Sequence, residues 1–411
     1  MKGDETALRK EKIRPTLDRL AENGFRQGEI ELSERFTEMM NPGKTLSIND
    51  YFAGGRRARE LLERIRKEGS VFRFDDAQSG LVFFLGLDTL GNGTVFGGVR
   101  LLPANSCDEA VRDALRLSEA MTHKLAMIFE PFGGGKLVVT APPSGKSEAA
   151  LLRIGDFTEA LDGLLRIAID FGFEPEDALK IRERTRFIDG YEGPGSLGAS
   201  GITTALGAME GMPAVLDEAF GSPKIPGRSF AIQGVGSVGK KLAELLLEDG
   251  AKLFISDTLE SRLKPFRGIG KVTLAEPDDL LLIDADVLCP SGPACVINPG
   301  TIPKLRSRVI AGVANCVLAD EVRDDALLLE KKVLFAPDFV LNAGGVTQGV
   351  EEVFKGAKDL QSSVDRLPII PKNMKAVFER AKRRRMGTMA AAKEIAEQRR
   401  LKIRAGLSRT P

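Results

Sequence analysis

The chain has 411 residues, of which 43% are apolar and 28% charged, the composition of an ordinary globular protein long enough for two domains. Its 59 basic and 58 acidic residues leave a formal charge of +1, which excludes a strong overall attraction to nucleic acid or to an anionic membrane. No apolar run approaches ~20 residues and no signal peptide opens the chain, so we expect a cytoplasmic protein.

The few metal-binding side chains argue against a metal centre. The four cysteines form no C-x-x-C pair, and His123 is the single histidine. A zinc site is therefore not expected, and reduced thiols in a cytosol are the simplest interpretation. We expect His123 to have a packing role, because the residue next to it, Lys124, is the stronger candidate for a binding side chain.

An N-terminal extension, residues 1–67, carries mixed charge and two helix-like segments, ALRKEKIRPTLDRLAENG and RRARELLERIRKEG, that each end at glycine. This pattern is typical of a solvated or subunit-contacting segment, and we attach no chemistry to it. From Val71 the pattern changes to strands. Alternating and apolar runs, broken by Ser-Gly and Gly-Asn-Gly, lead into VFGGVRLLP at residues 95–103.

Two lysines occupy positions that do not suit a solvated side chain. Lys124 falls within an apolar helical stripe that includes Met121 and Ile128. It is either a side chain that reaches out from the helix end or a cation held in a site. Lys136 follows three glycines, which let a ligand approach the backbone closely, and it precedes the buried strand LVVT. Desolvation lowers the pKa of such a lysine, so that it can act as a base or a nucleophile.

A proline-rich turn and an amphipathic helix lead to the next short apolar run, RIAIDFGF, which contains an isolated carboxylate, Asp170. The segment YEGPGSLGASG, at residues 191–201, is rich in glycine and indicates a hinge or a domain boundary. A helix is predicted over roughly residues 202–220. We therefore expect a second domain to begin here.

A dinucleotide-binding unit is predicted from residue 229 onward. The strand SFAIQ runs into the motif G-x-G-x-x-G, with Gly234, Gly236 and Gly239 as its glycines and Val238 before the last, and the helix KKLAELLLEDG follows. The next strand, KLFISD, ends in Asp257. This context favours a Rossmann fold, with pyrophosphate at the helix N-terminus and the adenosine ribose at the carboxylate. We predict NAD rather than NADP, because the carboxylate would repel a 2′-phosphate.

Four later segments, ADVLCP, RVIAGVAN, KVLFAP and DFVLNAGGV, are each predicted as a strand that ends in a loop of Asn, Pro or Gly. Parallel sheets bind their ligands at these C-terminal strand ends. Asn315 and Asn342 are then placed to contact the nicotinamide half of the cofactor. A simple turn asparagine explains either residue equally well.

The C-terminal segment, residues 371–411, holds 13 Lys or Arg and 3 Asp or Glu, a local charge of +10. Basic tails of this kind can bind nucleic acid. Because Phe378 is the only aromatic residue in the segment, we favour solvated helices that pack back on the first domain.

Several motifs together carry a resemblance to a known family. GGVRLLP, MTHK, PFGGGK, the isolated Asp170, GVGSVG with Asp257, IAGVAN and PDFVLNAGGV follow one another in an order and spacing similar to the glutamate/leucine/phenylalanine/valine dehydrogenases. The leucine and phenylalanine branch is the most similar, from roughly Phe72 to Arg404. The N-terminal extension is longer than the usual start of that branch.

The resemblance implies roles for individual residues. It makes Lys124 the ligand of the substrate α-carboxylate, Lys136 the catalytic lysine and Asp170 the group that moves protons to and from the amino group. It places Gly97 and Gly98 at the substrate, and Thr204, Asn315 and Asn342 at the nicotinamide and its ribose. The reaction it implies is reversible, NAD-dependent oxidative deamination of an L-amino acid to a 2-oxo acid and ammonia.

The predicted substrate pocket offers no cation to a second carboxylate. Glutamate-specific relatives carry a lysine where this chain has Phe96, and a serine where it has Gly349. With Met121, Ala168 and Val346 completing the pocket, a second carboxylate would be buried unpaired, so we predict an apolar amino acid. Gly349 makes room and Phe96 removes some, which leaves the size preference open.

The chain also departs from the family pattern, at Phe171-Gly172-Phe173 after Asp170 and at Ser291-Gly292-Pro293 after ADVLCP. A catalytically silent paralogue that binds NAD or an amino acid, and acts in regulation or assembly, is the alternative hypothesis. The expected architecture is a two-domain α/β fold and a homo-oligomer, without nucleic-acid or membrane partners. Its parts are an extension (1–67), a substrate and oligomerisation domain (68–195), a Rossmann NAD-binding domain (196–350) and C-terminal helices that return to the first domain (351–411).

Overall fold

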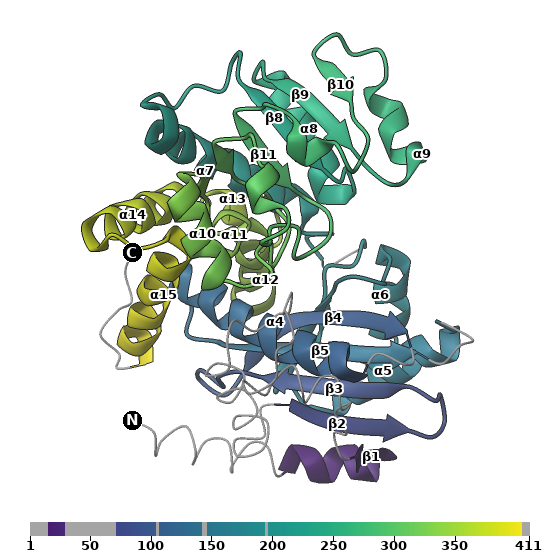
Figure 1. Cartoon of the computed structure of the whole chain (residues 1–411). Helices are drawn as coiled ribbons and strands as arrows, with labels where there is room; N and C mark the ends of the chain where they lie inside the picture. The colour runs from purple at the N-terminus through teal and green to yellow at the C-terminus, as the bar shows by residue number, and fades with distance from the viewer. Residues whose placement is uncertain (1–14, 29–70, 104–106, 142–145, 194–195, 405–411) are drawn as a thin grey trace.

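The computed structural model describes residues 15–28, 71–103, 107–141, 146–193 and 196–404, in two α/β lobes that each have their own sheet (Figure 1). The predicted two-domain α/β class is confirmed. Most of the predicted extension, residues 1–14 and 29–67, lies outside the described residues. Within the described ranges, no helix is long and apolar enough to cross a membrane.

The first sheet is mixed and has the order β1-β2-β3-β5-β4-β6-β7. Strands β4, β5, β6 and β7 run parallel, while β1, β2, β3 and β5 pair antiparallel. Helix α4 covers one face and α5 with α6 the other, as expected for strands that are buried on both sides. The bounds are β1 Phe25–Gly28, β2 Val71–Asp76, β3 Val82–Leu87, β4 Val95–Pro103, α4 Cys107–Met127, β5 Gly133–Ala141, α5 Glu148–Ala160, β6 Leu165–Ile169, α6 Pro175–Arg182 and β7 Ile188–Asp189.

Part of the predicted extension belongs to this first sheet. A helix over residues 15–22 leads into β1, which pairs antiparallel with β2. The Phe25 ring is 1% exposed and meets the rings of Phe83 and Phe157 edge-on, with centroids 5.5 and 5.0 Å away. The guanidinium of Arg153 lies 4.3 Å from the Phe25 ring centroid. A domain boundary at residue 67 would therefore cut through this core. The sequence gave no sign of the short strand β1.

We expect Phe25→Ala to lower the free energy of unfolding of the first domain by about 3–5 kcal/mol, because it removes a ring from a closed aromatic cluster. Urea denaturation followed by circular dichroism measures the change. Val322→Ala, at a side chain 61% exposed, is the matched control and should stay within about 0.5 kcal/mol of the parent. An effect of Phe25→Ala no larger than that of the control would show that β1 contributes nothing to the domain.

The second sheet is parallel throughout and has the order β10-β9-β8-β11-β12-β13. This is the strand order of the Rossmann fold, and it reverses between β8 and β11, where such folds bind dinucleotides. The bounds are α7 Gly201–Phe220, β8 Ser229–Gln233, α8 Ser237–Glu248, β9 Lys252–Ser256, α9 Glu260–Leu263, η1 Lys264–Phe266, β10 Val272–Leu274, η2 Leu280–Leu282, β11 Val287–Pro290, η3 Ile302–Lys304, β12 Val309–Ile310, α10 Arg323–Lys331 and β13 Leu334–Phe335.

The prediction of a strand at DFVLNAGGV is wrong. Asp338–Leu341 forms a helical turn, α11, and Gly344–Lys355 forms the helix α12. The Asp338 carboxylate accepts the backbone N–H groups of Phe339 and Val317, at 2.8 and 2.9 Å, and so fixes the start of the turn. All four residues of α11 are buried, which removes the polar face that distinguishes a helix from a buried strand.

The basic C-terminal segment folds back along both lobes (Figure 1). Helix α13, Gln361–Val364, precedes this segment, which contains most of α14, Ile369–Arg384, and all of α15, Thr388–Arg404. Helix α14 packs against α7, and α15 packs against α4. Several of its cations bind acceptors inside the molecule: Lys382 pairs with Glu218 at 2.8 Å, and Arg399 donates to the Met127 carbonyl at 2.9 Å. His123 Nε2 lies 3.1 Å from Glu397 Oε1, so this histidine joins α4 to α15, as its predicted packing role requires.

Candidate active site

A cavity of about 530 Å³ opens between the two sheets. It brings together every residue predicted to touch the substrate, from β4, β5, β6, α4 and α12. It also reaches the residues predicted at the nicotinamide end. The predicted residues that line it are Phe96, Gly97, Gly98, Met121, Lys124, Lys136, Ala168, Asp170, Thr204, Val238, Asn315, Asn342, Val346 and Gly349.

Neighbouring strands place the two catalytic candidates on one face of the first sheet. The parallel register of β4 with β5, from Phe96↔Gly134 to Val99↔Leu137, sets Gly98 beside Lys136. In β6, Ala168 pairs with Gly98, and Asp170 follows two residues later on the same face. A Cβ on Gly98 would lie 2.8 Å from Lys136 Nζ and 3.2 Å from Asp170 Cβ. A side chain at this position would therefore have to displace the Lys136 amine or Asp170.

Lys136 forms a close ion pair with Asp170. Burial lowers the pKa of Lys136, the Asp170 charge raises it and the Arg100 charge lowers it again, so the pKa stays below its ordinary value. Burial raises the pKa of Asp170, but the charges of Lys136 and Arg100 outweigh it, and the carboxyl group titrates well below its usual range. The pair therefore joins a stable carboxylate to a lysine that loses its proton more readily than usual.

Sequence reasoning missed Arg100, which holds the carboxylate of this pair. Its Nε donates to Asp170 Oδ2 at 3.2 Å, and its Nη1 donates to Asp113 Oδ2 at 2.7 Å. Arg100 stands in GGVRLLP, two residues after Gly98, so the same strand face carries both. Because alternate residues of a strand face the same side, the position of Arg100 two residues after Gly98 was the sequence signal that could have placed it in the site.

Lys124 points into the cavity rather than out from the helix end, which decides between the two interpretations of its position. It is 8% exposed, and its Nζ donates to Asn315 Oδ1 at 2.7 Å. The Nδ2 of Asn342 donates to the same oxygen at 3.0 Å, and to the carbonyls of Val313 and Ala314. Burial lowers the pKa of Lys124, partly offset by the Asp338 charge. Of the two asparagines, Asn315 therefore accepts the hydrogen bond of Lys124, and Asn342 donates to the same Asn315 oxygen.

The glycine motif of the second sheet has the shape of a pyrophosphate cradle. Gly234 has φ +90°, and a Cβ there would lie 2.9 Å from Gly292. At Gly236, the N-cap of α8, a Cβ would meet nothing closer than 3.9 Å, and no side chain in the described part of the protein caps the helix. This open helix N-terminus fits a dinucleotide phosphate.

Asp257 lies at the end of β9, as predicted, but its oxygens already accept two backbone N–H groups. Val235 donates to Oδ2 at 2.8 Å and Leu259 donates to Oδ1 at 2.9 Å. Arg262 Nη1 is 3.6 Å from Oδ2. The carboxylate is therefore fixed beside the glycine motif, with a cation next to it.

The wall around Phe96 and Gly349 has two features that the sequence did not settle. A Cβ on Gly349 would lie 2.5 Å from the ring of Phe96, so this ring already fills the room that the glycine leaves. Asp189 and Glu352 also line the cavity, and sequence reasoning missed both. A lone acid at a strand end, as in RFIDGYEG, was the signal for Asp189.

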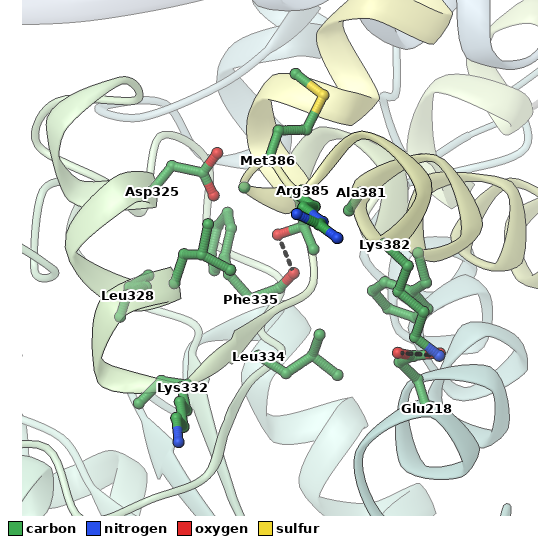
Figure 2. A pocket seen from close by; sticks show the side chains of 15 residues that line it. Glu218, Asp325, Leu328, Lys332, Leu334, Phe335, Ala381, Lys382, Arg385 and Met386 are labelled. Carbon is green, nitrogen blue, oxygen red and sulfur yellow. Dashed lines mark hydrogen bonds and ion pairs between the residues drawn. The ribbon is translucent and has the colours of Figure 1, made fainter.

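A second cavity, of about 450 Å³, lies away from these residues, between α7, α10, β13 and α14 (Figure 2). Its walls include Leu328, Leu334 and Phe335, and Thr388 Oγ1 donates to the Phe335 carbonyl at 2.6 Å. The described residues that line it include none of the predicted site residues. The predicted catalytic residues therefore line the cavity between the sheets and not this second one.

The Rossmann sheet and the cavity that it shares with a second α/β domain define a two-domain, nucleotide-dependent dehydrogenase. Residues 90–177 match the Glu/Leu/Phe/Val dehydrogenase dimerisation domain, and residues 257–404 match the Glutamate/Leucine/Phenylalanine/Valine dehydrogenase family. The chain belongs to this family.

Individual relatives support the assignment. The chain is 36% identical to phenylalanine dehydrogenase of Lysinibacillus sphaericus, over 73% of this chain and 80% of that one. It is 33% identical to leucine dehydrogenase of Bacillus cereus, over 83% and 92%. The crystal structure of L-tryptophan dehydrogenase from Nostoc punctiforme superposes with a TM-score of 0.67 at 31% identity, and covers 84% of this chain and 99% of that one.

Proposed function

We propose that the chain catalyses NAD-dependent, reversible oxidative deamination of an L-amino acid with an apolar side chain. The observation that carries the proposal is the Lys136–Asp170 pair, in which the lysine is buried, and which shares one cavity with Lys124 and with the residues predicted at the nicotinamide end. The relatives named above act on phenylalanine, leucine and tryptophan, which supports an apolar substrate. Because a dimerisation-domain model matches the first domain, we also propose a homo-oligomer formed through it.

Polar residues hold the carboxylate and the amino group of the substrate in this proposal, and apolar residues contact its side chain. Lys124 binds the α-carboxylate, and its bond to Asn315 fixes the direction of the ammonium group. Asp170 accepts a hydrogen bond from the α-amino group. The aliphatic or aromatic side chain of the substrate packs toward Phe96, Ala168 and Val346, while Gly97, Gly98 and Met121 line the path between.

The proton transfers follow from the two perturbed groups. When Lys136 is neutral, the cation that contributes most to the low pKa of Asp170 is gone, and the Asp170 carboxylate takes a proton from the substrate ammonium, which frees the nitrogen lone pair. A nicotinamide held by Thr204, Asn315 and Asn342 would take the hydride from Cα and would leave the substrate as an iminium ion. Lys136, as a neutral amine, removes a proton from the water that attacks the iminium carbon. Asp170 returns its proton to the nitrogen. The hydroxyl proton passes to solvent as the C–N bond breaks, and ammonia and the 2-oxo acid leave.

An absorbance assay at 340 nm tests the activity. Purified protein with NADH, ammonia and a panel of 2-oxo acids should consume NADH with the keto forms of leucine, phenylalanine and related apolar amino acids, and not with 2-oxoglutarate. Failure on every apolar 2-oxo acid, with NADH binding intact, would favour the silent paralogue instead.

We propose NAD as the cofactor because Asp257 is fixed at the end of β9, where the adenosine ribose binds in Rossmann folds. NADH should bind at least tenfold more tightly than NADPH, as measured by nucleotide fluorescence without substrate. Asp257→Ser should lower the ratio of the NADPH dissociation constant to the NADH dissociation constant. Arg262→Ala should raise this ratio, since it removes the cation that lies beside the Asp257 carboxylate. Equal binding of the two nucleotides by the parent protein would overturn the assignment.

A further inference from the structure

The ring of Phe96, which lines the substrate cavity, is supported by two further phenylalanines. Phe354 of α12 meets it edge-on, with ring centroids 6.1 Å apart and planes at 71°. Phe132, which directly precedes β5, stacks on Phe354 with centroids 3.6 Å apart and planes at 17°. Phe96 is among the described residues that line the cavity, and Phe132 and Phe354 are not. The two outer rings therefore act on a bound substrate through Phe96 rather than by contact.

The stack of Phe132 on Phe354 is anchored in both lobes. In the first lobe, the backbone of Phe132 forms a bridge with Gly91. On α12, Glu351 pairs with Arg366 at 2.7 Å, and Arg366 also pairs with Glu130 of the first lobe at 2.8 Å. The side chains of Glu130 and Glu351 are 9% and 8% exposed, so solvent screens these ion pairs little. Helix α12 is therefore tied to the segment that carries Phe132, which leaves the stacked rings little freedom to move.

The Phe96 ring closes the cavity at the backbone of α12. A Cβ on Gly349 would lie 2.5 Å from its Cζ, so the tip of the ring occupies the space beside this glycine. The ring is 4% exposed and packs in the same apolar core as Phe132 and Phe354. Protein interiors are closely packed, so a ring can turn only where a neighbour leaves room for it. The size of the side chain at Phe354 therefore decides whether Phe96 can leave this place.

We propose that Phe354 is a positioning residue that limits the length of the substrate side chain. Supported by Phe132, it keeps the Phe96 ring beside Gly349, and this ring closes the side-chain end of the cavity. A smaller residue in place of Phe354 gives Phe96 room to turn away from Gly349, and the cavity becomes longer. This inference rests on the proposed function, because it concerns the specificity of the same site.

A series of unbranched amino acids tests the proposal: norvaline, norleucine, 2-aminoheptanoate and 2-aminooctanoate. For the parent protein, kcat/KM should fall at the first member whose chain reaches the Phe96 ring. Phe354→Leu should raise kcat/KM for that member, relative to norvaline, at least tenfold, because room for one methylene in an apolar pocket is worth about 10–200-fold. The gain should lie in KM rather than in kcat, and kcat/KM for norvaline should stay within about threefold of the parent value.

Further variants separate a positioning role from general damage. Phe132→Leu should shift the ratio in the same direction, since it removes the support of Phe354. In a Phe96→Leu background, Phe354→Leu should no longer change the ratio, because the ring that it positions is absent. Phe220→Leu is the matched control, because this partly buried ring packs on the same apolar core and is not among the described residues that line the cavity. Phe354→Met, which is closer in volume to phenylalanine, repeats the comparison if the leucine variant does not fold.

Several outcomes would contradict the positioning role. An unchanged ratio in Phe354→Leu, an equal change in the Phe96→Leu background, or an equal loss for all four amino acids would overturn it, while turnover by the parent keeps the proposed function intact. The absence of any length limit in the parent protein would overturn it too. If the parent protein turns over no amino acid, the proposed function fails, and this inference fails with it.

Discussion

Replacing Lys136 by alanine is expected to lower kcat for oxidative deamination roughly 10²–10⁴-fold, the usual contribution of a general base. The Lys136 amine is 6% exposed and pairs with Asp170. Lys124, the other lysine among the described residues that line the cavity, is held by Asn315 and is not free to take its place. The substitution leaves Asp170 with Arg100, so the variant should still fold and bind NADH.

The pH dependence of kcat/KM provides a second test of the role of Lys136. Oxidative deamination needs the neutral amine, so kcat/KM should rise with pH as Lys136 loses its proton. Because burial lowers the pKa of Lys136, this rise should be centred below the ordinary value of 10.5.

Steady-state assays with the best apolar substrate, with thermal melting and NADH titration on the same samples, test both statements. Lys180→Ala is the matched control, because this lysine of α6 pairs with Glu148 of α5 and with Glu183, and it does not line the cavity. Retention of more than a tenth of kcat by Lys136→Ala would remove this lysine from the mechanism.

A single methyl group at Gly98 should be nearly as damaging. The added Cβ would lie 2.8 Å from Lys136 Nζ and must displace the amine or Asp170. Since displacements of about 1 Å at a reacting centre cost roughly 10²-fold, we expect kcat for Gly98→Ala to fall by about that factor. The contact is with the far end of a flexible side chain, so the sheet should survive and the melting temperature should change little.

Two other glycines provide the comparison. At Gly97 an added Cβ would lie 1.9 Å from the Gly135 carbonyl oxygen, a backbone atom, so Gly97→Ala should damage the sheet itself. At Gly270 no described atom lies within 4 Å, so Gly270→Ala should change neither activity nor stability. Normal activity of Gly98→Ala would show that the Lys136–Asp170 arrangement tolerates movement and is not the reacting geometry.

The fold followed from the sequence wherever periodicity and turn chemistry agreed. The G-x-G-x-x-G motif between SFAIQ and KLFISD correctly predicted β8, α8 and β9, because glycine spacing and the flanking strands are both local signals. The segment DFVL failed because every side chain of α11 is buried, so it has no polar face to show a helical period. Strand β1 failed because its partner β2 is distant in the sequence, and pairing over such a separation leaves no local pattern.

The same difference between local and long-range signals explains which residues of the candidate site the sequence could reveal. Lys124, Lys136 and Asp170 were found because a charged residue inside an apolar run is itself a local anomaly. Asp189 and Glu352 were missed because their proximity depends on β7 pairing with β6 and on α12 reaching the same cavity. The size prediction at Gly349 stayed open for a related reason: the ring that fills its space, Phe96, belongs to the other domain and lies far away in the sequence.

The central claim is that the α-hydrogen of an amino acid passes as hydride to the nicotinamide in the cavity between the two sheets. Deuterium transfer measures this directly. The best substrate of the panel, deuterated at Cα, is incubated with NAD and enzyme, and the NADH is analysed by mass spectrometry while ammonia is quantified. The account predicts NADH one mass unit heavier, with ammonia released in equal amount. Unlabelled NADH, or ammonia release without NADH, would contradict it.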